Sequence, residues 1–512
     1  MKKIIFVFFM VINLACYCQN ISFSKVIAPI ENVFSASFTA TGIVKQGNNY
    51  ILSLIGFDTA SVAHVNNLQS LYLAKVDSTG ENFKILNKYV QADTNYYTNW
   101  GAFIKTHNNG FCYVCDIDVL PDTNYNPKTQ HLIMLFDSSM NNTLTKIIPH
   151  DTIWEAVRQI KETSDHGFIL TGSRQLSDYE CDVPIIKTDS LGNQLWKTYI
   201  STGYYGNAVQ IEETPDHGFL ICGYRSSFTT GYGDPFIIKT DSAGNLKWLK
   251  ILGNPNQLDG DAAIAITKDS NYIVALGYAT ATINNNQGWL ARINVIKYSP
   301  DGTQIWNRMY DTIRYDYYVS KIQILPNNNF IVMGSNSIRD SLNFFATFLF
   351  KFDAIGDSLW RKTYYYTSEF GDHNLLFDNI LNTDESITAC GYVNGFSLSP
   401  YEQIWIMKTD SNGYSPACDY TGIGEQNMLL SKVEIKVYPN PATMQTTIAY
   451  PQLKEEGYIY IYNMLGQMVY EDKLAKGSMR TNLNIQNYKA GLYKVIIREK
   501  GIIKGENTLI KN

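Results

Sequence analysis

Two segments of the chain carry the residue types of general acid–base chemistry. They read Asp165-His166-Gly167 and Asp216-His217-Gly218. A histidine beside a carboxylate can accept a proton near neutral pH. The corresponding segments elsewhere read Asn108-Asn109-Gly110 and Asn327-Asn328-Asn329. Asp, Asn and Gly are typical of tight turns, because they tolerate a positive φ or bond to their own backbone. We therefore interpret all four segments as turns and assign no catalytic residue.

Two other patterns have the composition of metal sites but lack enough ligands. Cys112 and Cys115 have C-x-x-C spacing, but Phe111–Cys115 is typical of a strand, where residues three apart face opposite sides. No second C-x-x-C follows, so a zinc site is not predicted. Turns such as Asp241–Asn245 offer too few oxygen ligands for calcium. We predict no metal and no cofactor. The six cysteines beyond residue 18 are predicted to be mostly small core residues: Cys112, Cys115, Cys181, Cys222, Cys390 and Cys418.

Three polar residues are our candidates for ligand binding. Glu155, Asn207 and Asp261 each come just before or at the start of a predicted strand, and a small residue follows each of them. If these strands surround a common axis, the three side chains form a polar rim for a sugar, a peptide or a cation. A solvated channel mouth without a ligand is the alternative.

A repeat in the middle of the chain determines the predicted fold. Ser164–Gly172 is similar to Pro215–Gly223, and Ile-Ile-Lys-Thr-Asp-Ser follows each of them. A turn with glycine comes next, and a tryptophan follows the glycine by four residues. Four copies share this tail, with Trp196, Trp248, Trp306 and Trp360. The period of roughly 52 to 60 residues suits a propeller blade.

Each repeat predicts four short antiparallel strands joined by turns. In the clearest copy these are Ala208–Glu212, Phe219–Cys222, Pro235–Thr240 and a strand around Trp248. We count about seven units and predict an all-β, seven-bladed β-propeller, with six or eight blades as alternatives. The tryptophans are predicted to pack between neighbouring blades, with a sugar-stacking platform as the alternative.

The ends of the repeat region predict how the ring closes. The last unit stops at Cys418 without a tryptophan strand. Before the first unit, Ile21–Ile27 is similar to Trp196–Ile200. We therefore predict that this N-terminal strand completes the last blade, which removes two exposed strand edges.

The N-terminus has the pattern of a secretory signal peptide. Lys2 and Lys3 precede a short apolar run, Ile4–Ile12, which is too short to span a bilayer. We predict a signal peptide over 1–18, with a lipoprotein signal at Cys16 as the alternative. The net charge is −5 and the pI is about 5.9. Without a basic stripe, a nucleic-acid partner is not predicted, and no other segment has the length and apolarity of a transmembrane helix.

The C-terminus carries three motifs in a fixed order. The motif residues are Tyr438, Pro439, Asn440 and Pro441, then Asn463, Leu465, Gly466 and Gln467, then Gly491, Leu492 and Tyr493. Together with their terminal position, they resemble the type A sorting domain of the type IX secretion system. The strand pattern predicts a small sandwich, and the resemblance implies an Ig-like one. It also implies handling by the type IX machinery at the outer membrane.

The predicted organisation has four parts. They are the signal peptide (1–18), the propeller (19–420), a linker (421–432) and the sorting domain (433–512). We expect a protein that is secreted or attached to the cell surface. No nucleophile–base pair has convincing spacing, which favours a non-enzymatic propeller that binds a glycan, a protein or another extracellular ligand. The alternative is an extracellular hydrolase or lyase that acts on a polysaccharide or peptide, because propeller enzymes gather residues from distant blades.

Overall fold

The chain divides into two units in the computed structural model, residues 1–421 and 422–512. The structure describes residues 22–27, 37–57, 69–89, 94–97, 102–119, 128–148, 154–177, 180–226, 233–254, 257–282, 289–338, 344–367, 371–395, 399–415, 420–421, 435–453, 455–463, 468–499 and 502–512. The predicted signal peptide, linker residues 422–432 and the motif residues Leu465, Gly466 and Gln467 lie outside these ranges.

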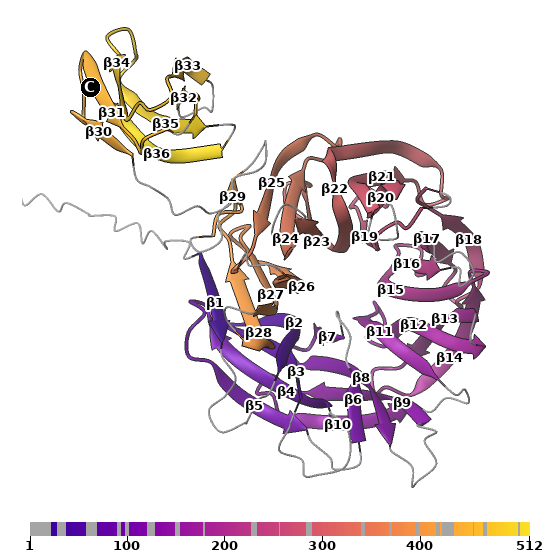
Figure 1. Ribbon diagram of the computed structural model, residues 1–512. Helices are drawn as coiled ribbons and strands as arrows, with labels where there is room; N and C mark the ends of the chain where they lie inside the picture. Colours follow the sequence, from indigo (N-terminus) through magenta and orange to yellow (C-terminus); the bar gives the residue numbers. More distant parts are fainter. Residues whose placement is uncertain are drawn as a thin grey trace, which may run out of the picture. The chain divides into compact units, whose positions relative to one another are not determined.

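The first unit is all-β, and its strands surround a central opening (Figure 1). Antiparallel pairing groups the described strands into seven meanders, which we number as blades 1 to 7 in chain order. The all-β propeller prediction is confirmed. In most blades the innermost strand comes first in the chain, and its partners follow outward in order, as the alternation of short apolar runs and turn residues predicts.

The strands of blades 1 to 3 follow the chain directly. Blade 1 contains β2 (Phe38–Gln46), β3 (Asn49–Phe57), β4 (Gln69–Asp77) and β5 (Lys84–Tyr89). Blade 2 contains β6 (Thr94–Tyr97), β7 (Phe103–Lys105), β8 (Phe111–Val119), β9 (Lys128–Phe136) and β10 (Asn142–Ile148), and both β6 and β7 pair with β8. Blade 3 contains β11 (Glu155–Glu162), β12 (Phe168–Ser177), β13 (Glu180–Thr188) and β14 (Gln194–Ser201).

In blades 4 to 6, one strand is shared. Blade 4 contains β15 (Tyr205–Glu213), β16 (Phe219–Ser226), β17 (Gly233–Thr240) and β18 (Leu246–Ile251). Blade 5 contains β19 (Ala262–Ile266), β20 (Tyr272–Thr282), β21 (Trp289–Tyr298) and the first part of β22 (Gln304–Ile324). Blade 6 contains the second part of β22, β23 (Phe330–Ile338), β24 (Phe344–Phe352) and β25 (Ser358–Tyr364), whose outer edge pairs with β29 (Tyr420–Thr421).

Blade 7 joins the two ends of the ring. It contains β26 (His373–Leu381), β27 (Ile387–Gly395), β28 (Ser399–Lys408) and the N-terminal strand β1 (Phe23–Ile27). Strand β1 pairs antiparallel with β28, from Phe23 opposite Lys408 to Ile27 opposite Ile404. Residues far apart in sequence therefore complete one blade, which confirms the predicted closure.

The tryptophans of the repeat pack against the following blade. The Trp196 ring lies where a Cβ on Gly244 would come within 2.7 Å of it, and Gly244 has a φ of +83°. The same contact recurs in four pairs: Trp196 with Gly244, Trp248 with Gly302, Trp306 with Gly356 and Trp360 with Gly413. Each glycine is both the left-handed turn residue and the space that the ring fills. The prediction that the tryptophans pack between blades is confirmed.

Phe23 occupies this position at the seam of the ring. It lies opposite Lys408, just as Trp196 lies opposite Lys187. A Cβ on Gly80 of blade 1 would come within 2.6 Å of the Phe23 ring. Phe23 is only 5% exposed and belongs to a cluster with residues of blades 1 and 7.

The Asp-His-Gly segments are turns whose carboxylates are already engaged. Asp165 Oδ1 accepts hydrogen bonds from Gly167 N at 3.0 Å and from Lys187 Nζ at 3.0 Å. These contacts, with that from the Thr163 hydroxyl, help to lower the pKa of Asp165 to about 2 although burial opposes the shift. His166 takes the left-handed position of the turn, with a φ of +63°. The interpretation of these segments as turns is confirmed.

The described cysteines are core residues. Cys112, Cys115, Cys181, Cys222 and Cys390 are buried free thiols, and burial raises the pKa of each one. Cys418 lies outside the described residues. The prediction of small core residues is therefore confirmed for these five.

The second unit contains two small antiparallel sheets. One sheet contains β30 (Lys436–Tyr438), β31 (Gln445–Ala449) and β34 (Arg480–Asn484). The other contains β32 (Gly457–Asn463), β33 (Met468–Leu474), β35 (Gly491–Glu499) and β36 (Ile502–Lys511). Buried residues of both sheets, such as Ile448 and Val495, share one core. This unit is a sandwich, as predicted.

Candidate functional site: the central cavity

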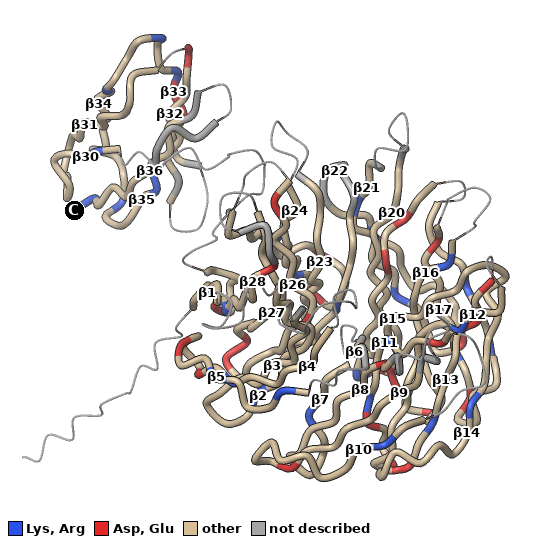
Figure 2. Tube along the Cα trace, turned by 60° about the horizontal axis from the view of Figure 1, so that its bottom comes forward, with Lys and Arg blue, Asp and Glu red and all other residues tan. Residues whose placement is uncertain are grey.

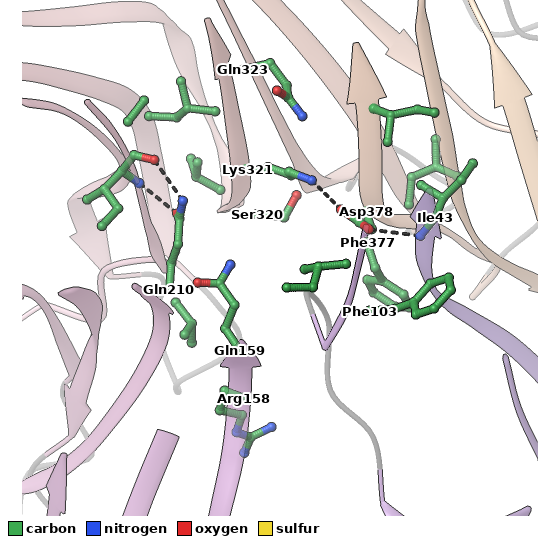
Figure 3. Close-up of a pocket in the computed structure, with 18 of the residues that line it drawn as sticks. Ile43, Phe103, Arg158, Gln159, Gln210, Ser320, Lys321, Gln323, Phe377 and Asp378 are labelled. Atoms are coloured by element: carbon green, nitrogen blue, oxygen red, sulfur yellow. Dashed lines mark hydrogen bonds and ion pairs between the residues drawn. The ribbon is translucent and has the colours of Figure 1, made fainter. Parts of the chain in front are cut away.

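A cavity of about 1480 Å³ occupies the centre of the propeller. Its lining includes residues of the innermost strand of every blade, which are β2, β7, β11, β15, β19, β22 and β26, and of further strands such as β24 and β27. Figure 3 shows side chains from different blades converging on it. A site in this cavity can therefore combine residues that are distant in sequence.

In four blades the innermost strand has a bulge whose extra residue lines the cavity. In blade 3 the register shifts between Val157 and Gln159, so that Arg158 is the extra residue. The same shift leaves Val209, Ser320 and Phe377 as the extra residues of blades 4, 6 and 7. All four line the cavity. A β-bulge can turn a side chain away from the regular alternation of its strand.

The residue that follows the bulge bonds to the next innermost strand. Gln159 Oε1 accepts a hydrogen bond from Ile211 N at 2.6 Å, and Gln210 Oε1 accepts one from Ile264 N at 2.9 Å. Asp378 Oδ2 accepts one from Ile43 N at 3.0 Å (Figure 3). These buried bonds fix the wall of the cavity, since breaking one leaves an unpaired buried group.

Several charges of the wall are paired across neighbouring blades. Lys321 Nζ lies 2.5 Å from Asp378 Oδ1 (Figure 3), and Lys161 Nζ lies 2.8 Å from Glu212 Oε1. Along the described strands, basic and acidic residues are interspersed (Figure 2). The wall therefore offers fixed dipoles and balanced charge rather than a field of one sign.

One side of the cavity has polar groups from blades 3 to 5. Asn207 Nδ2 donates to the Tyr224 hydroxyl at 3.1 Å, whereas the buried Asn207 Oδ1 has no hydrogen-bond partner among the residues that the structure describes. Burial raises the pKa of Asp261 to about 6, although the Arg158 guanidinium partly opposes the shift. An unpaired buried acceptor is costly and calls for an explanation. A ligand hydroxyl or N–H in the cavity would satisfy it.

Blades 6 and 7 contribute aromatic rings to the cavity lining. The Phe345 ring lies 5.1 Å from His373, and the Phe377 ring lies 5.5 Å from Tyr392. All four line the cavity. Burial lowers the pKa of His373, which favours the neutral imidazole. Aromatic faces of this kind suit stacking against an apolar ligand surface.

The structure brings two of the three predicted ligand-binding residues into the cavity. Asn207 and Asp261 line it, whereas Glu155 does not. Glu155 aligns with Gly206 rather than with Asn207, because Val157 and Ala208 each lie opposite the corresponding glycine of the next strand. A shift of one residue moves a side chain to the other face of a strand.

Glu155 belongs instead to a buried network between blades 2 and 3. Its Oε1 lies 3.0 Å from His131 Nε2 and 2.6 Å from Lys197 Nζ, while His131 Nδ1 lies 2.7 Å from Asp116 Oδ1. The two carboxylates raise the pKa of His131 to about 8 although burial opposes the shift. The His131 and Lys197 partners lower the pKa of Glu155 to about 2, again against the effect of burial.

Sequence reasoning missed the residues at and directly after the bulge, and it missed the aromatic residues of blades 6 and 7. Gln159 and Gln210 occupy equivalent positions in two similar repeats, and this repetition was the available signal. Phe377 and His373 come from a divergent unit with no such signal.

Among the described residues, His107, Glu162 and His166 form the group of three with spacing suited to a metal ion. Glu162 also lines the cavity.

The motif residues of the second unit hold its ends together. Asn440 Nδ2 donates to Thr508 O at 2.7 Å, and Asn440 Oδ1 accepts from Ile510 N at 2.7 Å. Asn463, at the end of β32, lies opposite Tyr493 of β35. The first motif and the chain end therefore form one structural element.

Comparison with known proteins assigns the second unit to a family. Residues 436–512 match the secretion system C-terminal sorting domain, which confirms the resemblance. The match indicates export to the cell surface or secretion. No curated protein sequence matches the chain. Among the described residues, no helix is long and apolar enough to cross a membrane.

Several solved structures are similar to the propeller, at low sequence identity. A protein of unknown function from Dyadobacter fermentans is 9% identical, with a TM-score of 0.41 over 76% of this chain and 98% of that one. An ulvan lyase is 7% identical, with a TM-score of 0.46 over 77% and 95%. An α-L-arabinanase from Penicillium chrysogenum is 12% identical, with a TM-score of 0.40 over 63% and 95%.

Proposed function

We propose that this chain is an exported propeller protein that binds an uncharged glycan in its central cavity without turning it over. The observation that carries the proposal is the pairing of two unlike sides. Among the described residues, the buried Oδ1 of Asn207 has no hydrogen-bond partner, and aromatic rings of blades 6 and 7 line another part of the cavity. A sugar ring presents hydroxyls at its edge and C–H groups on its faces, so it complements both sides.

The charges of the wall favour an uncharged ligand. Lys321 and Lys161 already have carboxylate partners, so a charged ligand would have to compete with these pairs for them. Amide groups such as that of Asn207 recognise hydroxyls without a net charge. A peptide is the alternative ligand, because its backbone also offers donors to Asn207 Oδ1.

Direct binding tests this proposal. The secreted protein is applied to an array of neutral oligosaccharides, and each hit is titrated by calorimetry. Phe377→Ala and Asn207→Ala should each weaken the affinity about tenfold or more, since a lost stack or hydrogen bond is worth about 1 kcal/mol or more. Tyr366→Ala is the control, because Tyr366 is exposed outside the cavity lining. Binding that is equal in all four proteins would contradict the proposal.

One observation favours an enzyme as the second candidate. Asp261 has a pKa raised to about 6, which suits a general acid in mildly acidic or neutral solution. A glycan hydrolase or lyase would need a carboxyl group that donates this proton or, when ionised, accepts one. The bound oligosaccharides are therefore incubated with the protein and followed by mass. Turnover that Asp261→Asn abolishes while binding persists would establish the enzyme, and intact oligosaccharides would favour the binding protein.

A further inference from the structure

Three side chains from blades 2 and 3 meet where the first and second strands of each blade are joined. His107 belongs to the turn between β7 and β8, Glu162 ends β11, and His166 belongs to the turn after it. Their ligand atoms all lie within 4.8 Å of one another. His107 Nδ1 lies 2.5 Å from Glu162 Oε1, and the two imidazole rings stack with centroids 3.7 Å apart at an angle of 21°.

Turn geometry does not account for these histidines. His166 takes the left-handed position with a φ of +63°, but the equivalent residue of blade 2 is Asn109, with a φ of +62°. His107 corresponds to Ser164 in the next turn. An asparagine and a serine therefore suffice to form the turn at these positions, and the turn does not require the two histidines.

We propose that His107, Glu162 and His166 bind a divalent transition metal ion of the zinc class. Imidazole nitrogen and carboxylate oxygen are ligands that Zn²⁺ prefers, and three protein ligands leave a position for water. Two nitrogens on one tetrahedral zinc stand ~3.3 Å apart, from bond lengths of ~2.0–2.1 Å. The three ligand atoms lie within 4.8 Å of one another, so a small tilt of the two stacked rings brings their in-plane lone pairs onto one ion. On metal binding the proton between His107 Nδ1 and Glu162 Oε1 leaves this position, and the ring keeps one N–H at Nε2, so that the imidazole binds as a neutral ligand.

The site is held in place before any metal binds. Glu162 Oε2 accepts a hydrogen bond from His107 N at 2.7 Å, which fixes the carboxylate against the turn of blade 2. The Glu162 side chain is 15% exposed, whereas the His107 side chain is 46% exposed. One ligand is therefore anchored, and the histidines remain accessible to ions from solvent. A bound metal would join blades 2 and 3 and would stabilise the propeller.

The junction of blades 3 and 4 supplies a matched comparison. There Ser164 Oγ lies 2.7 Å from Glu213 Oε1 and 3.2 Å from His217 Nδ1. Glu213 Oε1 lies 3.1 Å from His217 Nδ1. The three positions are the same, but a serine replaces the first histidine. A neutral hydroxyl is a much weaker ligand for zinc, so this junction should bind it poorly.

The test is calorimetric titration of Zn²⁺ into the chain, purified without a histidine tag and stripped with chelator. One ion per chain should bind, with a rise in melting temperature. His107→Ser and His166→Asn use residues that the chain itself has at equivalent positions, so the fold should persist. Each should weaken zinc binding at least about tenfold, since the loss of even an outer-shell partner costs 10–100-fold. His217→Asn should leave the affinity unchanged.

A gain of function completes the test. Ser164→His should give the second junction two histidines and a glutamate, and so raise the stoichiometry to two ions per chain. No zinc binding by the original chain would overturn the proposal. So would an affinity that His107→Ser and His166→Asn leave unchanged, because the ion would then be bound elsewhere.

Discussion

Replacing Phe23 by alanine tests the role of the N-terminal strand in closing the ring. Phe23 is 5% exposed and packs against Gly80 of blade 1 from within blade 7. Removal of a buried phenylalanine side chain costs about 3–5 kcal/mol. A propeller of about 400 residues has an unfolding entropy of about 0.8 kcal/mol/K, from ~2.1 cal/mol/K per residue. If the propeller unfolds as one unit, its melting temperature should fall by about 4–6 °C.

Scanning calorimetry of the full chain measures this shift. Leu246→Ala is the matched control, because Leu246 also lies on an outer strand but is 49% exposed. It should change the melting temperature by less than about 1 °C, as surface substitutions usually stay within about 0.5 kcal/mol. If the Phe23→Ala variant has the same melting temperature as the Leu246→Ala control, β1 does not close the ring. A chain that begins at Phe38 lacks the whole strand and should be destabilised further or be insoluble.

Three further predictions concern the network between blades 2 and 3, the turn glycines and export. His131 has a pKa of about 8 in the fold against an ordinary value of 6.5. Protonated His131 should therefore contribute about 2 kcal/mol to the free energy of unfolding below pH 6.5, and this contribution should be lost as the pH rises through 8. In the His131→Asn variant, the melting temperature should fall less between pH 6 and 9 than it does in the original chain. Gly244→Ala should cost more free energy of unfolding in denaturant than Gly47→Ala: both glycines have positive φ, but only Gly244 faces a ring at 2.7 Å. Deletion of residues 433–512 should leave the propeller in the periplasm, and a normal amount in the medium, measured by immunoblot, would contradict the sorting assignment.

The parts of the fold that the sequence predicts are those that repeat. The tryptophan, the glycine four residues before it and the Asp-His-Gly turn recur because each blade meets its neighbour in the same way. Phe23 shows how far this reasoning extends. Phe23 is a different residue type from Trp196, yet the pattern around it predicts a strand. In the structure, Phe23 has the same register in its blade as Trp196 has in blade 3.

The remaining features depend on contacts that no local pattern records. Strand β22 runs from blade 5 into blade 6 without a break, whereas the repeat indicates two separate strands. The network of His131, Asp116 and Glu155 joins three strands of two blades, and its members belong to no motif. Glu155 is an exception, because the offset of 51 residues between Ser164–Gly172 and Pro215–Gly223 already aligns it with Gly206 rather than with Asn207.

The bulge also explains where this propeller can vary without losing its fold. The residue after the bulge is committed to the next innermost strand in three blades, as Gln159, Gln210 and Asp378. The bulge residue is more variable, and it is an arginine, a valine, a serine and a phenylalanine in blades 3, 4, 6 and 7. These four positions differ between otherwise equivalent blades, and all four face the cavity. His107 follows the same rule, because it replaces the serine of the neighbouring turn. In a ring of repeats, departures from the repeat are the best guide to residues whose role is not to maintain the fold.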